Sequence, residues 1–257
     1  MNVLRAAALA FSAFSKIPMP QVEWREDNMR LMMCFFPLVG LVIGLIVAAW
    51  TWFAGWANLG SVLFGAGVAL LPAAISGGIH LDGFCDVVDA QSSHASPERK
   101  REILKDPHAG AFASIGVAAY LIAYTAIASE LTPSWRIAIL LVGIHVMSRC
   151  MSGIATVTFP RNASRGMLSM FHDAGQSKIV PIVLLIELVT CGAAMAFVSL
   201  PAACATLVGG LACMALLLPF ANTQFGGMSG DLAGFFLQVA ELVMLAALVI
   251  AAKVMGL

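Results

Sequence analysis

The sequence predicts an all-α fold, a polytopic membrane helix bundle of about seven transmembrane helices with one further helix at the amino terminus. Hydrophobic residues make up 60% of the 257 residues and charged residues 11%, whereas roughly a quarter of the residues of an average soluble domain are charged. The mean hydropathy is +0.92. Several apolar stretches reach the length of about 20 residues that a bilayer-spanning helix needs. We therefore expect residues 1–257 to form a single integral membrane domain.

The amino-terminal segment has a short apolar run, Ala6 to Ser15, between Arg5 and Lys16. A secretory signal peptide has such a run too, but this one is broken by serines, is followed by two prolines and lacks a good cleavage site. We expect a retained interfacial or half-buried helix. The sequence leaves open whether this segment spans the membrane.

Seven apolar stretches qualify as spans, and the first of them could include a kink at Pro37. They are Leu31 to Gly55, Leu59 to Ile79, Ala109 to Leu131, Trp135 to Phe159, Ile179 to Leu200, Ala202 to Ala221, and Leu232 to Val254.

Basic residues alternate between the links, as they do when short cytoplasmic loops collect Lys and Arg. This pattern places the amino terminus and the link after the second span in the cytoplasm, and the carboxyl terminus outside the cell membrane. Most acidic residues fall at the same cytoplasmic face, whereas transporters more often place polar groups near the midplane. The basic groups are Arg5, Lys16, Arg25 and Arg30, then Arg99, Lys100, Arg101 and Lys105, then Arg149, Arg161, Arg165 and Lys178.

Three carboxylates stand out in the stretch GGIHLDGFCDVVDA, residues 77–90. Asp82, Asp86 and Asp89 follow steps of four and three, which place them on one face of a helix. Stacked acids repel one another, and a divalent cation would relieve that repulsion. Mg²⁺ prefers such hard oxygen ligands and completes its shell with water and substrate phosphate. The alternative is a solvated helix end, which the apolar residues between the acids disfavour.

The hydrophilic link after these aspartates predicts a short helix. Ser96 is a good N-cap with Pro97 at the first helical position, and we expect the helix to run to Lys105, before Pro107. This segment could be an ordinary charged helix on the protein surface, or its basic side chains could neutralise a substrate phosphate. The same two alternatives apply to a second basic cluster, Arg149, Arg161 and Arg165, which could instead contact anionic lipid head groups.

The last span carries a polar face made of Asp231, Gly234, Gln238 and Glu241. Glu241 lies about 15 Å along the helix from Asp231 at the usual rise per residue. An ionisable group at that depth indicates a functional site, or else a hydrogen-bonded structural glutamate. Glu187 and His145 look isolated in their spans, and His145 is expected to be a core histidine.

Two classes of site find no support in the composition. Six cysteines occur singly without a CxxC spacing, so neither a disulfide framework nor a zinc site is expected. The formal net charge is zero, so nothing favours a nucleic-acid partner.

The remaining polar residues are the parts that phosphoryl transfer needs. Carboxylates could hold Mg²⁺, basic groups could neutralise phosphates, and glycines permit close backbone approach. The glycines concentrate at Gly77, Gly78 and Gly83 and again at Gly226, Gly227, Gly230 and Gly234. The residues alone thus suggest a membrane transferase that uses a nucleotide-activated donor.

A run of motifs resembles the cobalamin (5'-phosphate) synthase family, also called adenosylcobinamide-GDP ribazoletransferase. They are FSKIPMP, FFPLVGLVIG, GGIHLDGFCDVVDA, REILKDPHAGAFASIG, the Ser148-Arg149 pair, PRNASRG and GGMSGDLAG, in this order. The resemblance implies a membrane transferase of the last steps of cobalamin biosynthesis. It would move the adenosylcobinamide phosphate moiety from adenosylcobinamide-GDP to α-ribazole or α-ribazole 5'-phosphate, with Mg²⁺, and release GMP.

The resemblance also implies residue roles. Asp82, Asp86 and Asp231 would bind the metal, and Asp86 and Asp89 would be catalytic. Asp89 is the candidate for the base that accepts the ribazole hydroxyl proton, by analogy with CDP-alcohol phosphotransferases, which also use helical aspartates at membrane faces. Substrate contacts would come from His80, Lys105, Asp106, Arg149, Arg161, Arg165, Gly227 and Glu241.

Two other classes remain possible on the sequence alone. A secondary transporter could bind its coupling ion at the aspartates, although it predicts paired repeats with matching broken helices. A membrane prenyltransferase would be expected to show two similar acid-rich helices, whereas Asp231 stands alone in its loop. The partners expected are small-molecule substrates and the lipid bilayer, and the sequence leaves oligomerisation open.

Overall fold

The computed structural model describes residues 3–106, 108–161 and 179–256, except for the side chains of residues 26 and 27. The regular elements in these ranges are all helical, which confirms the predicted fold class. They are α1 (Val3–Phe14), α2 (Glu26–Met29), the 3-10 helix η1 (Met32–Phe35), α3 (Phe36–Trp56), α4 (Ser61–Ser76), α5 (Ile79–Ser92), α6 (Pro97–Ile103), α7 (Ala111–Ala128), α8 (Trp135–Thr158), α10 (Ile179–Val198), α11 (Leu200–Phe225) and α12 (Gly230–Met255).

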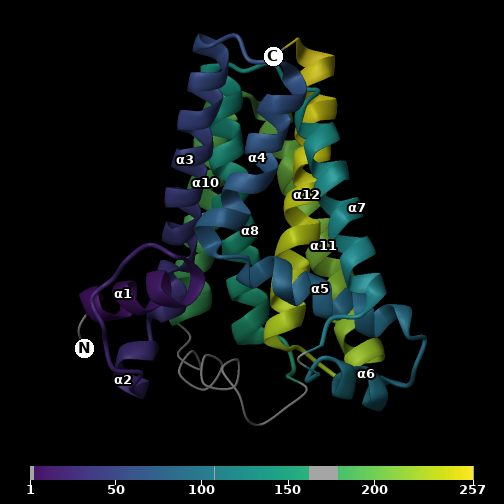
Figure 1. Cartoon of the computed structure of the whole chain (residues 1–257). Coiled ribbons are helices and arrows are strands. Elements are labelled where there is room, and N and C mark those ends of the chain that lie inside the picture. The colour runs from purple at the N-terminus through teal and green to yellow at the C-terminus, as the bar shows by residue number, and fades with distance from the viewer. Residues whose placement is uncertain (1–2, 107, 162–178, 257) are drawn as a thin grey trace.

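The long helices stand side by side as a bundle (Figure 1). Among the described residues, six helices are long and apolar enough to cross a membrane, and α4 with α5 makes a seventh if the bent pair counts as one span. The amino terminus, α6 and the start of α12 lie at one end of the bundle, and the carboxyl terminus lies at the other (Figure 1). The chain is therefore a multi-pass membrane protein whose acidic motifs share one end.

The second predicted span breaks earlier than its apolar run suggested. The helix α4 ends at Ser76, and the chain turns by 99° before α5 begins. Gly77 and Gly78 both have positive φ angles, of 67° and 78°, a left-handed conformation that glycine adopts without a steric penalty. This double turn lays the aspartate helix α5 across the lower part of the bundle instead of continuing the span.

The amino-terminal helix α1 is half buried against the bundle, as the sequence predicted. Its residues Leu9, Ala10 and Phe11 are buried in a cluster with Met32 and Phe36. At 12 residues α1 is too short to cross a bilayer as a helix. It lies beside the start of α3, at the end of the bundle that holds α5 and α6 (Figure 1).

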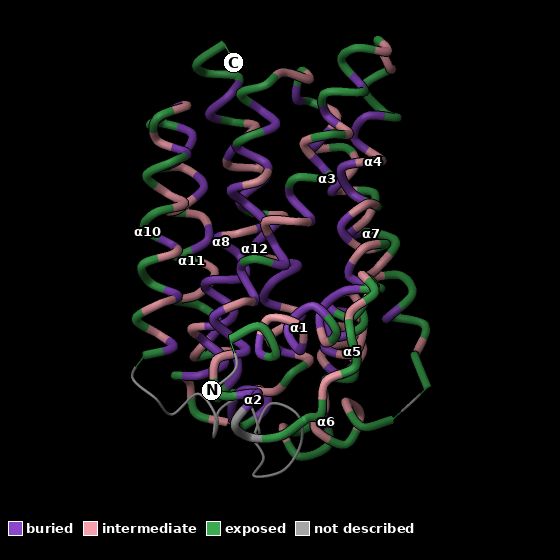
Figure 2. The backbone as a smooth tube through the Cα atoms, turned by 90° about the vertical axis from the view of Figure 1, so that its left-hand side faces the viewer, coloured by how far each residue is buried: buried purple, intermediate pink, exposed green. Residues whose placement is uncertain are grey.

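The helices α8 and α12 form the centre of the bundle. Buried positions recur along both of them, whereas α7, α10 and α11 expose apolar side chains along much of their length (Figure 2). Exposed apolar side chains on the outer helices suit contact with lipid, which is as apolar as they are. Polar groups on α8 and α12 are thereby kept in the interior of the protein.

The short helix α6 is tied to its neighbours by buried polar contacts. Ser96 caps it by accepting a hydrogen bond from the backbone N–H of Arg99, as predicted, although the helix ends at Ile103 and not at Lys105. The Lys100 Nζ group is buried and donates to Gln91 Oε1 at 2.9 Å and to Gln224 Oε1 at 2.6 Å. These bonds join α6 to the end of α5 and to α11.

Candidate active site

The helices α5 and α12 cross at two glycines, and this crossing brings the two aspartate motifs together. A Cβ atom on Gly83 would lie 2.8 Å from the Asp231 carbonyl oxygen and 2.9 Å from its Cα. A Cβ on Gly234 would lie 3.0 Å from the His80 carbonyl oxygen. Only glycine permits such an approach of two backbones. Asp82, next to Gly83, therefore comes to lie beside Asp231, far away in the sequence.

Asp82 and Asp231 line one cavity of about 260 Å³ between α1, α3, α5, α8 and α12. Asp82 also lines a second cavity of about 660 Å³, together with Lys16 and Gly77. The backbone N–H of Lys16 donates to the Ile75 carbonyl at 2.8 Å, which holds the segment after α1 against the α4–α5 turn. Sequence reasoning placed Lys16 only among the topological charges and missed that it lines a cavity together with Asp82.

The other two predicted carboxylates continue along α5. Burial, together with the negative charges of Asp82, Asp231 and Asp89, raises the pKa of Asp86 to about 6. Asp89 lies at the start of α7, where a Cβ on Gly110 would overlap both of its carboxylate oxygens. The helix thus presents its carboxylates in a row from the cavities to the start of α7.

A divalent cation is the group that these carboxylates imply. Among the described residues, no three His, Cys, Asp or Glu side chains converge closely enough to hold a metal by themselves. Mg²⁺ commonly takes one or two carboxylates and fills its remaining positions with water and substrate phosphates. Within the described ranges, no basic side chain forms an ion pair with Asp82, Asp86 or Asp231. Their oxygen donors fit Mg²⁺, and its binding stays a prediction.

The loop before α12 meets the end of α8. The backbone N–H of Met228 donates to the Pro160 carbonyl at 2.7 Å, and Arg161 forms a β-bridge with Met228. Arg161 thus lies beside the loop that leads to Asp231. In the same loop, Gly227 has a φ of 132° and donates its N–H to Ala221. The predicted contact residue Arg165 lies outside the described residues.

Lys105 and Asp106 follow the end of α6. Asp106 Oδ1 accepts the backbone N–H of His108 at 3.0 Å and lies 2.8 Å from His108 Nδ1. These hydrogen bonds lower the pKa of Asp106, so its carboxylate is ionised at neutral pH. Substrate contacts by either residue stay predictions.

Arg149 and Glu241 lie inside the bundle and contact each other. Arg149 Nη1 is 2.5 Å from Glu241 Oε1, His145 Nδ1 is 3.0 Å from the same oxygen, and Ser148 Oγ donates to it at 2.9 Å. All four side chains are buried. The sequence grouped Arg149 with the surface charges and left His145 isolated, but the structure places both in this buried cluster. A substrate contact by Arg149 or Glu241 stays a prediction.

The prediction that His145 belongs to the core is confirmed, since it is fully buried. Its pairing with Glu241 was missed because the two residues are 96 positions apart. The spacing of His145, Ser148 and Arg149 on one helical face was the available signal, since steps of three and four align side chains.

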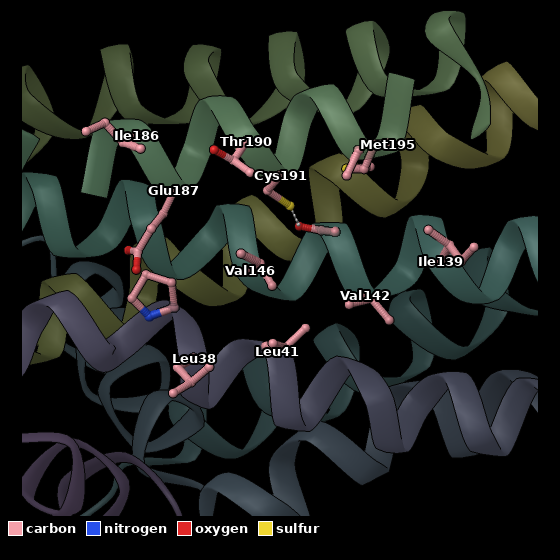
Figure 3. Close-up of a pocket in the computed structure, with 13 residues that line it drawn as sticks. Leu38, Leu41, Ile139, Val142, Val146, Ile186, Glu187, Thr190, Cys191 and Met195 are labelled. Carbon is pink, nitrogen blue, oxygen red and sulfur yellow. Dashed lines mark hydrogen bonds between the residues drawn. The ribbon is translucent and has the colours of Figure 1, made fainter. Parts of the chain in front are cut away.

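Glu187 lies in a different place from the aspartates. It points into a cavity of about 370 Å³ between α3, α8 and α10, whose other lining residues are mostly apolar (Figure 3). In that cavity, Cys191 Sγ donates to the Gly143 carbonyl at 3.7 Å. None of the predicted site residues lines this cavity, so Glu187 serves as a reference carboxyl group outside the site.

The family model described as cobalamin-5-phosphate synthase matches residues 6–249. The chain belongs to this family. The match covers both aspartate motifs, the α5–α12 crossing and the buried Arg149–Glu241 pair. Membership confirms the resemblance that the motifs indicated, and it makes the chain a transferase of cobalamin biosynthesis.

Curated relatives of this cobalamin-5-phosphate synthase family member match more than nine tenths of its length. The chain is 41% identical to a protein of Lachnoclostridium phytofermentans over 98% of this chain and 95% of the relative. It is 32% identical to one of Clostridium botulinum, over 94% of this chain and 96% of the relative. A Geobacillus thermodenitrificans protein is 29% identical over 91% and 90%. All three are named adenosylcobinamide-GDP ribazoletransferase. No solved structure matches the chain.

Proposed function

We propose that this chain transfers the adenosylcobinamide phosphate moiety from adenosylcobinamide-GDP to α-ribazole or α-ribazole 5'-phosphate and releases GMP. The observation that carries this proposal is the crossing at Gly83 and Gly234, which sets Asp82 and Asp231 at one cavity. Two carboxylates from separate helices beside a cavity suit a phosphate-bearing substrate when a cation is shared between them. The names of the relatives support the choice of substrates.

In this proposal Asp82, Asp86 and Asp231 hold Mg²⁺. The ion, when bound, neutralises charge on the pyrophosphate of the donor, which is the main electrostatic need of phosphoryl transfer. Asp86 belongs to this set because it follows Asp82 by four positions in α5 and so lies on the same face of that helix, one turn further along.

The protein side chains then position and activate the acceptor. The acceptor hydroxyl oxygen forms a bond to the phosphorus that carries cobinamide, and the bond from that phosphorus to the GMP oxygen breaks. The hydroxyl proton passes to the Asp89 carboxylate, with Asp86 beside it on the same helix face. Arg161, Lys105 and Arg165 supply positive charge for phosphate oxygens, Gly227 shapes the loop before Asp231, and Asp106 offers an ionised acceptor near α6.

We place this chemistry at the cytoplasmic face of the cell inner membrane, with the amino terminus inside and the carboxyl terminus outside. Support comes from the arrangement of the helices, because α5, α6 and the start of α12 share one end of the bundle (Figure 1). The basic residues of the links concentrate at that end as well, as they do on the cytoplasmic side.

The test is GMP release from adenosylcobinamide-GDP plus α-ribazole by purified protein in detergent, with and without Mg²⁺. We expect Asp82→Asn and Asp231→Asn to lower the rate about 100-fold or more, as loss of a charged group aimed at a transferring phosphate does. Glu187→Gln is the matched control, because it removes a carboxylate outside the site and should keep the wild-type rate. Lack of GMP release by folded wild-type protein would exclude the reaction, and full activity in both aspartate variants would exclude the site.

One observation favours a second function, an ion-coupled transporter that uses the aspartates as its cation site. The broken pair α4–α5 carries these aspartates, and secondary transporters often place ion sites at broken helices. Such transporters place the site near the midplane between repeats, whereas α5 lies toward one end of the bundle (Figure 1). Cation-driven uptake into proteoliposomes, abolished by Asp82→Asn without any effect on GMP release, would favour the transporter.

A further inference from the structure

The cavity that Asp82 and Asp231 share has an aromatic part that phosphate chemistry does not use. Phe14, Phe36 and His80 line it together. The ring centroids of Phe14 and Phe36 are 4.3 Å apart, and the His80 ring lies 6.0 Å from Phe14 and 5.6 Å from Phe36. These three rings come from α1, α3 and α5, and we call them the aromatic wall. A flat apolar group packs well against such a surface.

One ring nitrogen of His80, in the aromatic wall, has no hydrogen-bond partner in the described part of the chain. His80 is only 5% exposed, and its Nε2 atom is buried without a partner among the described residues. A buried polar atom without a partner is unfavourable, so such an atom points to a missing ligand. A ligand that packs on the aromatic wall and pairs with His80 therefore combines a flat apolar body with a polar atom at its edge.

The size of the cavity narrows the choice of ligand. Its volume is about 260 Å³, close to the lower end of the roughly 300–1,000 Å³ typical of small-molecule sites. A nucleoside is small enough for a cavity of this volume, whereas the corrinoid macrocycle of the proposed donor is far larger. The corrinoid therefore has to remain outside this cavity.

We propose that this cavity binds the acceptor nucleoside, with its base on the aromatic wall and the Nε2 atom of His80 donating a hydrogen bond to the base. This inference rests on the proposed function, because the acceptor is taken from it. The base of α-ribazole is a flat bicyclic benzimidazole that has one ring nitrogen free to accept a hydrogen bond. With the base at His80, the ribose extends toward Asp82 and Asp231, where the phosphorus of the donor must arrive.

The guanine base of the donor fits this cavity less well. Guanine carries several donors and acceptors along its edges, and each would need a partner on burial. At the wall, His80 offers one ring nitrogen, and Phe14 and Phe36 offer no polar atom. The nearest hydroxyls, on Ser152 and Thr156, belong to the α8 side of the cavity, and the Ser152 hydroxyl already donates to the Ala233 carbonyl. A benzimidazole needs only one polar contact, so the chemistry of this wall selects the acceptor over the donor.

The test compares the KM values of the two substrates in steady-state kinetics of GMP release. His80→Phe keeps an aromatic ring but removes the hydrogen bond, and we expect it to raise KM for α-ribazole about tenfold, as loss of one desolvated hydrogen bond does. KM for adenosylcobinamide-GDP should stay within about twofold of wild type, since the donor makes no contact there. His80→Gln retains an N–H donor and should restore part of the acceptor affinity. Phe14→Leu, which shortens the wall, should also raise only the acceptor KM.

Direct binding gives a second measurement that needs no catalysis. Calorimetric titration of α-ribazole into the wild type and His80→Phe, both monodisperse in detergent and with equal melting temperatures, should show the same loss of affinity. GMP should bind both proteins equally. If His80→Phe fails to fold, the same titrations with His80→Gln and Phe14→Leu decide the question.

The outcomes distinguish this inference from the proposed reaction. Binding of α-ribazole that depends on His80 in a protein that releases no GMP would support the cavity and exclude the reaction. GMP release with an unchanged acceptor KM and unchanged α-ribazole binding in His80→Phe would support the reaction and overturn the inference. A rise in the donor KM, in place of the acceptor KM, would also overturn it.

Discussion

Arg149 on α8 and Glu241 on α12 form an ion pair of 2.5 Å at the centre of the bundle, where each side chain is almost completely buried. His145 and Ser148 contact the same Glu241 oxygen. Buried charges are tolerated only when paired and hydrogen-bonded. Glu241 belongs to the polar face of the last span, which the sequence indicated as a functional site. In the structure this residue connects the two central helices, α8 and α12.

The first prediction concerns that pair. Arg149→Met leaves the Glu241 carboxylate buried without its cation, and we expect the free energy of unfolding to fall by about 3 kcal/mol, near the lower end for a broken buried pair because two contacts remain. Chemical denaturation in detergent measures the change. The double variant Arg149→Met/Glu241→Met should recover most of the loss, and equal stabilities of the single variant and wild type would contradict the prediction.

The second prediction concerns the crossing of α5 and α12. Gly83→Ala places a methyl group against the Asp231 backbone, and we expect it to cost about 1–3 kcal/mol through overpacking and to abolish most GMP release. Gly192→Ala on α10 is the control, because a Cβ there meets nothing within 4 Å. The control should be neutral or slightly stabilising. Wild-type activity of Gly83→Ala would mean that the close approach is unimportant for the site.

The third prediction concerns the attachment of α6. Lys100→Met removes two buried hydrogen bonds, to Gln91 and Gln224, and should lower stability by about 1–3 kcal/mol because their oxygens lose a charged donor. Arg99→Met breaks only the exposed pair with Glu102 and should change stability by less than about 1 kcal/mol. Limited proteolysis should cut the α6 segment faster in Lys100→Met than in Arg99→Met. Equal cleavage rates would argue against the role of Lys100.

The fourth prediction concerns pH. The backbone N–H and the ring of His108 lower the pKa of Asp106. The pKa of Asp106 in the folded protein lies below its unfolded value. The contact with His108 therefore stabilises the local turn fully at a pH above the unfolded pKa, and this stabilisation is lost as the pH falls through the folded pKa. NMR titration of the carboxyl carbon should show the lowered pKa, and His108→Ala should bring it partway back. An unchanged pKa in His108→Ala would assign the effect to the backbone alone.

The sequence predicted the helices and the carboxylate face of α5 because both depend on local patterns. Apolar stretches of span length are visible without any tertiary information, and Asp82, Asp86 and Asp89 share a helix face through their spacing alone. Contacts between distant segments are different. Nothing local to Asp231 indicates that its backbone packs on Gly83, and nothing local to His145 indicates Glu241, since each contact arises from the packing of whole helices.

The break between α4 and α5 shows what hydropathy alone fails to predict. Gly77 and Gly78 permit unusual backbone angles, yet the apolar run continues to Ile79, so the span predicted from hydropathy passes through them. Hydropathy measures only the length of an apolar run. The direction of the chain depends on two φ angles that it does not report.

The place of Phe14 at the end of α1 has a practical consequence for work with this protein. One wall of the cavity beside Asp82 and Asp231 is supplied by a residue that precedes the first spanning helix. Deletion of the first fourteen residues would open that wall while leaving every spanning helix intact. Affinity tags therefore belong at the carboxyl terminus, which lies at the opposite end of the bundle (Figure 1).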